Sequence, residues 1–262
     1  MRLQLGISLL ALGLAAPLAN AAIIIASHSA DTNPMLEGWG AGGVLLGSAG
    51  VGITALSVND SGTKAWQITD TSSTDCLVYY YMSSGLTAAA ADPKGSWTET
   101  AKMRVASNDS AANYSAAMYI FDGTHDVALT FVGTAANSND NGLWYCSKNG
   151  TPVLIHGFDT ATAYHNYQFV YNSDQSDRYT VYIDGNNVGF IPKDNVPLYA
   201  STPLIGFGAL SGPGKGSSDW NSVTFETGQV LAPFVPLPGV PEPASLGLLG
   251  VAALGLLRRR RA

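Results

Sequence analysis

The chain has 262 residues, of which 46% are hydrophobic and only 12% are charged, and its net charge is −6 at pH 7. Five of the thirteen basic residues are Arg2 and the four arginines near the C-terminus, and Glu242 is the one acidic residue outside the body. Residues 22–228 therefore carry eight basic and eighteen acidic side chains, a net charge of −10. An acidic body argues against binding to nucleic acid or to anionic membrane surfaces. About 200 residues suffice for one sizeable core.

The first 21 residues have the parts of a secretory signal peptide. Arg2 precedes an apolar run, Leu5–Leu18, and Ala19-Asn20-Ala21 is a small-residue cleavage site. Such a segment is removed on export and does not belong to the fold. We therefore expect a signal helix at residues 1–21, with a retained N-terminal anchor as the alternative.

The body, residues 22–228, contains about a dozen short runs of β-branched and aromatic residues with turn signals between them. Three turns have the Asp-Gly or Asn-Gly character of hairpins, at Asp122-Gly123, Lys148–Gly150 and Asp184–Asn187. Residues 31–43 are expected to form a loop, and Leu86–Ala91 is the one helical stretch. No alternation of strands and helices is present, so the pattern predicts an all-β sandwich or barrel. The expected strands are Ile23–Ala26, parts of Val44–Val58, Ala65–Thr69, Leu77–Met82, Trp97–Val105, Ser115–Phe121, Val127–Val132, Leu143–Cys146, Val153–Ile155, Tyr167–Tyr171, Tyr179–Ile183, Val188–Ile191, Leu204–Ala209 and Ser222–Thr227.

A proline-rich spacer, residues 229–239, leads into a C-terminal segment, residues 240–262. In this segment Pro241-Glu242-Pro243 comes directly before the uncharged apolar run Ala244–Leu257, and Arg258, Arg259, Arg260 and Arg261 follow at once. Fourteen helical residues span about 21 Å, less than the ~30 Å apolar core of a bilayer, and a basic cluster tends to stay cytoplasmic. The tripartite tail resembles the PEP-CTERM sorting signal of Gram-negative bacteria. The resemblance implies a hydrophobic anchor helix in the inner membrane, an exosortase-type membrane protease as partner, and delivery to the cell surface or extracellular matrix.

The order of elements in residues 77–228 resembles the concanavalin A-like, laminin-G-type jelly roll. A short helical piece leads into the strand at Trp97, followed by Tyr119–Gly123, Tyr164–Tyr171, Val181–Gly185 and a final strand within Asp219–Gly228. The fold class expected is thus an all-β jelly-roll sandwich with a helix at either end of the chain.

Enzyme signatures are missing from the sequence. Glycoside hydrolases of this fold carry carboxylates two and five residues apart on one strand, whereas Glu37, Glu99 and Glu226 have no acidic partner at i+2. Glu99 would share a strand face with Trp97 and Ala101. The chain also has no Gly-x-Ser-x-Gly elbow and no His-Glu-x-x-His motif. We therefore expect a non-catalytic protein, with a hydrolase based on aspartates as an alternative.

Candidate binding residues are few. Laminin-G-type folds often hold Ca²⁺ on loop oxygens, and the resemblance makes Asn139, Asp140 and Asp219 candidate ligands, with solvated turns as the alternative. Trp144 and Tyr145, near the first of these loops, are candidates for contact with a glycan, although aromatics on strands commonly belong to the core.

The two cysteines, Cys76 and Cys146, could form a disulfide in an exported protein, or remain two buried thiols. Taken together, the sequence predicts an exported surface or matrix protein associated with polysaccharide. A purely structural surface protein and a divergent glycan-active enzyme are the alternatives.

Overall fold

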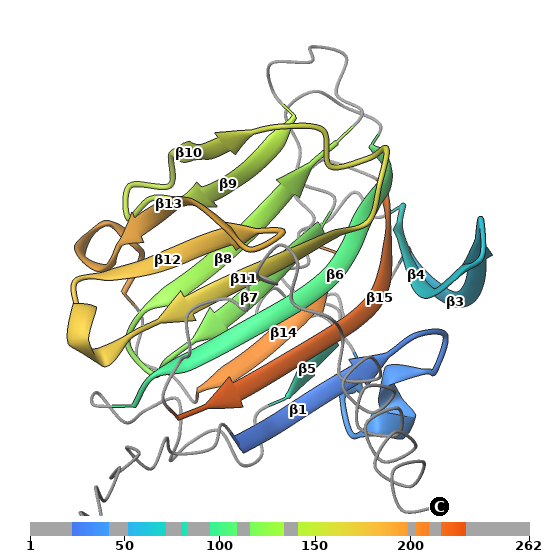
Figure 1. The fold of residues 1–262 in the computed structure, drawn as a ribbon, viewed down its shortest axis with the longest axis horizontal. Coiled ribbons are helices and arrows are strands. Elements are labelled where there is room, and N and C mark those ends of the chain that lie inside the picture. The colour runs from blue at the N-terminus through green and yellow to red at the C-terminus, as the bar shows by residue number, and fades with distance from the viewer. Residues whose placement is uncertain are drawn as a thin grey trace, which may run out of the picture. The chain divides into compact units, whose positions relative to one another are not determined.

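The structure is a computed structural model that describes residues 23–41, 52–71, 80–82, 95–108, 116–133, 141–198, 203–209 and 216–228. The described residues form two antiparallel sheets packed face to face (Figure 1), which confirms the all-β sandwich. The expected signal peptide, the helical stretch Leu86–Ala91, the spacer and the sorting segment lie outside the described residues. Among those that are described, no helix is long and apolar enough to cross a membrane.

The first sheet has eight strands among the described residues, in the order β13-β12-β11-β6-β15-β4-β3, with β1 also paired to β15. Their bounds are β1 Ile23–Ser29, β3 Ile53–Asp60, β4 Thr63–Asp70, β6 Trp97–Asn108, β11 His165–Tyr171, β12 Arg178–Ile183, β13 Asn186–Pro192 and β15 Gly216–Thr227.

The second sheet has seven strands in the described part of the chain, in the order β10-β9-β8-β7-β14-β5-β2. Their bounds are β2 Gly40–Ala41, β5 Tyr80–Met82, β7 Ala116–Phe121, β8 Asp126–Val132, β9 Gly142–Cys146, β10 Pro152–Gly157 and β14 Leu204–Gly208. The described connections contain the short 3₁₀ helices η1 Pro34–Glu37, η3 Ser173–Gln175 and η4 Lys193–Asn195.

Alternation along the strands fills the space between the sheets with large side chains. Trp97 is 2% exposed, and its ring lies within 6 Å of those of Phe169, Tyr171, Tyr179 and Phe225, which come from three neighbouring strands. Aromatic rings at these separations contribute about 0.5–1.5 kcal/mol per pair beyond the area they bury. This cluster fixes the end of the sandwich at which β6 begins and β15 ends.

β15 runs through the middle of the first sheet and has a different partner along each half of one edge. It pairs with β6 along its whole length, with β4 from Gly216 to Trp220, and with β1 from Ser222 to Thr227. The change of partner occurs at Asn221, whose Nδ2 donates to the carbonyl of Lys64 and whose carbonyl accepts from the backbone N–H of Ala30.

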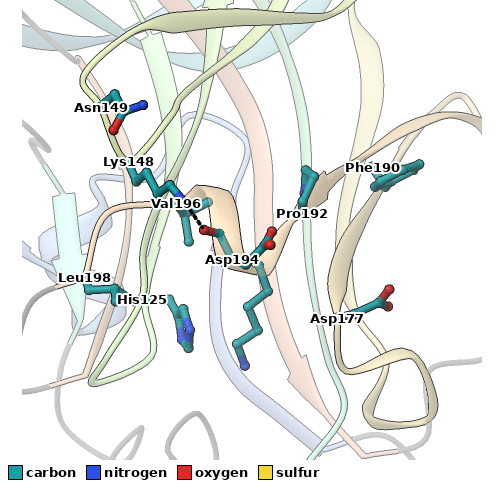
Figure 2. Close-up of a pocket in the computed structure, with 10 residues that line it drawn as sticks. His125, Lys148, Asn149, Asp177, Phe190, Pro192, Asp194, Val196 and Leu198 are labelled. Atoms are coloured by element: carbon teal, nitrogen blue, oxygen red, sulfur yellow. Dashed lines mark hydrogen bonds between the residues drawn. The ribbon is translucent and has the colours of Figure 1, made fainter.

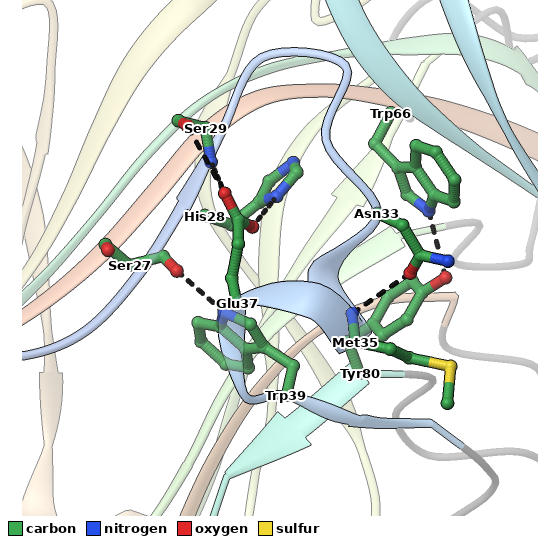
Figure 3. A network of polar contacts seen from close by, with 9 residues as sticks. All are labelled: Ser27, His28, Ser29, Asn33, Met35, Glu37, Trp39, Trp66 and Tyr80. Atoms are coloured by element: carbon green, nitrogen blue, oxygen red, sulfur yellow. Dashed lines mark hydrogen bonds and ion pairs between the residues drawn. The ribbon is translucent and has the colours of Figure 1, made fainter.

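The first described residues are fastened to this sheet by a polar network (Figure 3). Glu37 at the end of η1 accepts from the backbone N–H of Ser29 at 3.0 Å and lies 2.7 Å from Nδ1 of His28. Trp39 donates its indole N–H to the carbonyl of Ser27. Because His28 is 1% exposed and stacks on Phe207 of the opposite sheet, this network ties η1 and β1 to the core. Residues 31–43, expected as loop, therefore contain η1 and the short strand β2 in their described part.

The predicted hairpins are present, with one difference of detail. Asp184 and Gly185 have φ values of 48° and 81°, as a tight two-residue hairpin turn requires. The turn after β7 spans residues 122–125 and is longer than the two-residue Asp184-Gly185 turn, and β8 begins at Asp126, one residue before the expected Val127. The Asp122 carboxylate accepts the backbone N–H groups of Thr124 and His125 and so holds the longer turn.

Candidate functional site

A pocket of about 850 Å³ lies where turns of the second sheet meet the edge of the first (Figure 2). Its walls come from the β7–β8 turn, the β9–β10 turn, β13 and the segment that begins with η4. The lining residues are His125, Lys148, Asn149, Asp177, Phe190, Pro192, Lys193, Asp194, Val196 and Leu198.

The Asp122 carboxylate organises the side of the pocket beside His125. Its Oδ2 lies 3.0 Å from Nδ1 of His125, 3.3 Å from the hydroxyl of Tyr179 and 3.6 Å from Nζ of Lys193. Burial, together with the charge of Asp122, raises the pKa of Tyr179, so the phenol stays protonated and donates its hydrogen bond. Lys193 also lies 4.5 Å from the ring centroid of Tyr171. The ammonium group is thus compensated by a carboxylate and an aromatic face.

The segment from Lys193 to Leu198 crosses from the first sheet to the second and closes this end of the sandwich. The backbone N–H of Lys148 donates to the carbonyl of Asn195 at 2.8 Å, and Nζ of Lys148 donates to the carbonyl of Asp194. The amide of Asn195 donates to the hydroxyl of Tyr145 at 2.8 Å. These bonds hold the pocket wall to β9 and its turn, so the pocket is formed before any ligand enters.

Phe190 is the large apolar side chain that the pocket exposes on the first sheet, and 50% of its surface is accessible. The guanidinium of Arg178 lies over its ring, 4.8 Å from the centroid. Asp177 in turn holds Arg178 by two hydrogen bonds, of 2.9 and 2.7 Å. Paired contacts of this kind fix the plane of a guanidinium, so the Phe190 ring rests on an oriented support.

Trp144 and Tyr145, predicted as glycan contacts, do not form one surface. They are neighbours on β9 and point to opposite faces of the sheet. Tyr145 is 5% exposed and belongs to the core between the sheets, whereas Trp144 is half-buried on the outer face. Of the two, Tyr145 contributes to the pocket only indirectly, through Asn195.

Asp219, predicted as a calcium ligand, is 1% exposed and has protein donors on both oxygens. Gln67 donates to Oδ1 at 2.8 Å, and Arg104 lies 3.0 Å from Oδ2. Arg104 therefore compensates its charge. Asn139 and Asp140 lie outside the described residues. Within the described ranges no group of three His, Cys, Asp or Glu side chains could hold a metal ion.

The other predicted residues lie in the core, at the end of β9 or outside the described ranges. Glu99 does share a face with Trp97 and Ala101, and this face is turned into the core. It is 0% exposed with no hydrogen-bond partner on either oxygen, and burial raises its pKa well above the usual value. Cys146 is an exposed free thiol and Cys76 lies outside the described residues, so the disulfide remains a prediction.

Sequence reasoning missed Phe190, because the run Val188–Ile191 alternates like any strand and gives no sign that β13 lies at an edge. The signal that could have drawn attention to the pocket was local: the Asp122 turn and the Lys-Asn-Gly turn are both polar loops at strand ends.

Comparison with known families gives one match, in which the PEP-CTERM protein-sorting motif covers residues 235–261. The match begins five residues before the predicted segment. The motif indicates sorting by an exosortase and export. A search of curated proteins gives no match.

Solved structures resemble the sandwich at low sequence identity. A carbohydrate esterase of the Shiga toxin-encoding bacteriophage phi24B superposes with a TM-score of 0.56 and 16% identity over 80% of this chain and 100% of that chain. An endo-β-1,4-glucuronan lyase from the fungus Trichoderma reesei superposes with a TM-score of 0.46 and 13% identity, over 79% of this chain and 97% of that chain. Domain 4 of the arabinanase AbnA from Geobacillus stearothermophilus superposes with a TM-score of 0.42 and 15% identity, over 80% of this chain and 95% of that chain. At these identities the likeness concerns the fold alone, and it rests on the first structure.

The two matches describe different parts of the chain and are consistent with its sequence. The chain contains a jelly-roll β-sandwich followed by a C-terminal PEP-CTERM protein-sorting motif.

Proposed function

We propose that this protein is exported to the cell surface or extracellular matrix of a Gram-negative bacterium and binds polysaccharide there without catalysing a reaction. In this proposal the signal peptide is removed during export and the C-terminal segment anchors the chain in the inner membrane until an exosortase acts on it. The sorting motif supports the route, and the pocket beside Phe190 is the observation that carries the binding function.

The pocket has the composition expected of a glycan site. It combines an exposed aromatic ring with hydrogen-bond donors and acceptors for sugar hydroxyls. The side chains of Lys148 and Asn149 can donate, and those of Asp194 and Asn149 can accept. It is also preformed, because the bonds between η4 and the β9–β10 turn hold its wall. The phage esterase that shares the fold is named for an action on carbohydrate, and this makes a carbohydrate the first class of ligand to test.

The non-catalytic part of the proposal is supported by the positions of two glutamates. Glu99, in the middle of the sandwich, has no contact with solvent. Glu37 is bonded to His28 and Ser29 within the network that fastens η1. Both positions support the proposal, because the acid and nucleophile of a glycosidase must reach the bond between two sugars.

A purely structural role is the second candidate, and the outer face of the first sheet favours it. Uncharged polar side chains form rows across adjacent strands there, with Thr98, Thr100, Gln168, Thr180 and Thr224 all partly exposed. Such a surface remains soluble without binding a small ligand.

Binding of the purified exported protein to a glycan array, with and without EDTA, separates these functions. We expect binding that persists in EDTA. No binding to any glycan would favour the structural role. Loss of binding in EDTA would show that binding depends on calcium or another divalent cation. Release of new reducing ends from a bound polysaccharide would overturn the non-catalytic assignment.

A further inference from the structure

We propose that the pocket at the end of the sandwich selects uncharged polysaccharide and that Phe190 is the platform on which a sugar ring stacks. The inference rests on the proposed function and adds to it the ligand class and the residue that recognises it. It depends on three observations: the exposed ring, its oriented support and the charge balance of the pocket.

The exposed ring leaves apolar surface in water that a ligand can cover. Half of the Phe190 surface is accessible on β13, an edge strand, so its apolar area is in contact with water in the free protein. The flat C–H face of a pyranose ring is apolar and presents weakly positive hydrogens to the negative face of an aromatic ring. A sugar therefore covers Phe190 and makes a favourable electrostatic contact at the same time.

The support of the ring reduces the entropy lost on binding. Asp177 fixes the guanidinium of Arg178, and Arg178 lies over the ring of Phe190 at 4.8 Å. A ring held on one side by a stacked cation has less freedom to lose when a ligand packs against it. Phe190 thus acts as a preorganised surface.

The charge balance excludes an acidic ligand. The lining residues include two lysines and two aspartates. Lys193 is already compensated by Asp122 and the Tyr171 ring, and Lys148 is bonded to the carbonyl of Asp194. Because the two lysines and two aspartates of the lining cancel, the pocket has no net charge to attract a carboxylate, and the body of net charge −10 repels a polyanion at long range. A neutral polysaccharide is neither attracted nor repelled by these charges.

The experiment measures retardation of the purified exported protein in gels that contain a neutral β-glucan, a neutral mannan or a polyuronate. Phe190→Ala is compared with Phe190→Tyr, which keeps the ring, and with Leu56→Ala. Leu56 is the matched control because it is 49% exposed on β3, at the other edge of the same sheet. Thermal melting of each variant checks that the fold is retained.

We expect at least one neutral polysaccharide to bind more tightly than the polyuronate at low salt. Phe190→Ala should weaken that binding at least tenfold, whereas Phe190→Tyr and Leu56→Ala leave it within twofold. Should Phe190→Ala fail to fold, Phe190→Trp provides a second measurement, since its indole fluorescence should shift when the neutral glycan is added, relative to the parent protein under the same conditions.

The possible failures are distinguishable. If the parent protein binds none of these glycans and none on an array, the proposed function itself is wrong. If it binds a neutral glycan and Phe190→Ala binds equally well, the function stands and the platform is elsewhere. A preference for the polyuronate would overturn the ligand class.

Discussion

The guanidinium of Arg104 lies 3.0 Å from the Asp219 carboxylate and, through a second nitrogen, 2.9 Å from Asp60. It therefore joins β6 and β15 in the middle of the first sheet to the end of β3 at its edge. Because Asp219 is buried and Arg104 is only 24% exposed, loss of the cation leaves two carboxylates facing each other without compensation.

Replacement of Arg104 by methionine should lower the free energy of unfolding by about 2–3 kcal/mol. Removal of one partner of a fully buried ion pair costs about 3–5 kcal/mol, and the partial exposure of Arg104 reduces that cost. Urea denaturation measures the change. Lys64→Met is the control, because the exposed pair between Lys64 and Asp31 should contribute less than about 1 kcal/mol. Equal effects of the two substitutions would contradict the role assigned to Arg104.

Glu99 should make the domain less stable as the pH rises. Its pKa is raised by burial in the folded state and returns to about 4.3 in the unfolded chain. The folded state therefore holds a proton that the unfolded state releases, and stability falls from that pH upward until the folded carboxyl itself titrates, by at most about 1.4 kcal/mol per pH unit. Below the unfolded pKa this loss is absent.

The variant Glu99→Gln keeps the shape of the side chain and removes the titration. Its free energy of unfolding, measured by urea denaturation between pH 4 and pH 8, should lack the decline that Glu99 contributes. The infrared band of a protonated carboxyl should also disappear. A variant that retains the full slope of the parent protein would show that Glu99 is ionised in the fold.

Two glycines with positive φ should respond differently to substitution. Gly142, at the start of β9, has a φ of 146°, and a Cβ there would press against the carbonyl oxygen of His156. Gly62 has a φ of 90° and open space around it. We expect Gly62→Ala to cost about 1 kcal/mol through backbone strain alone and Gly142→Ala to cost several times more, since backbone atoms of β10 must move. Urea denaturation measures the loss in free energy of unfolding for both variants. A larger loss for Gly62→Ala than for Gly142→Ala would contradict the prediction.

The sorting motif predicts a specific product at the C-terminus. If an exosortase processes the segment, mass spectrometry of the exported protein should show a chain that ends near Pro241–Pro243 and lacks the four arginines. Replacement of Pro241, Glu242 and Pro243 by alanine should leave the full-length chain in the membrane fraction. A mature protein that retains Arg258–Arg261 would show that the segment is a permanent anchor.

The sequence predicts local features well because local chemistry determines them. The Asp184-Gly185 hairpin follows from two residues that tolerate positive φ, and the shared face of Trp97, Glu99 and Ala101 follows from the period of a strand. The same period implies that Trp144 and Tyr145 cannot lie on one surface. They were nevertheless predicted together as glycan contacts, because both rings are aromatic.

The candidate site was not predictable, since it depends on contacts between distant segments. Whether a strand face points to core or solvent is decided by what packs on it, and Glu99 is buried on a face where its register neighbours are Phe169 of β11 and Phe225 of β15. Phe190 is exposed because it points to the outer face of the first sheet, opposite to its buried neighbour Ile191, and which face of β13 is the outer one depends on the packing of the whole sandwich. The binding residue is therefore found only after the topology is known.

The position of β15 has a mechanical consequence. The spacer and sorting segment follow this strand in the chain, so force applied to them enters the sandwich at Thr227, the last residue of β15. That strand is hydrogen-bonded on both sides, to β6 over its full length and to β1 and β4 in turn along its other edge. A load along the strand axis shears these ladders, so many hydrogen bonds must break together, rather than one at a time as in a hairpin opened from its end. Force on the C-terminal segment thus reaches the core through a strand that is paired along both edges.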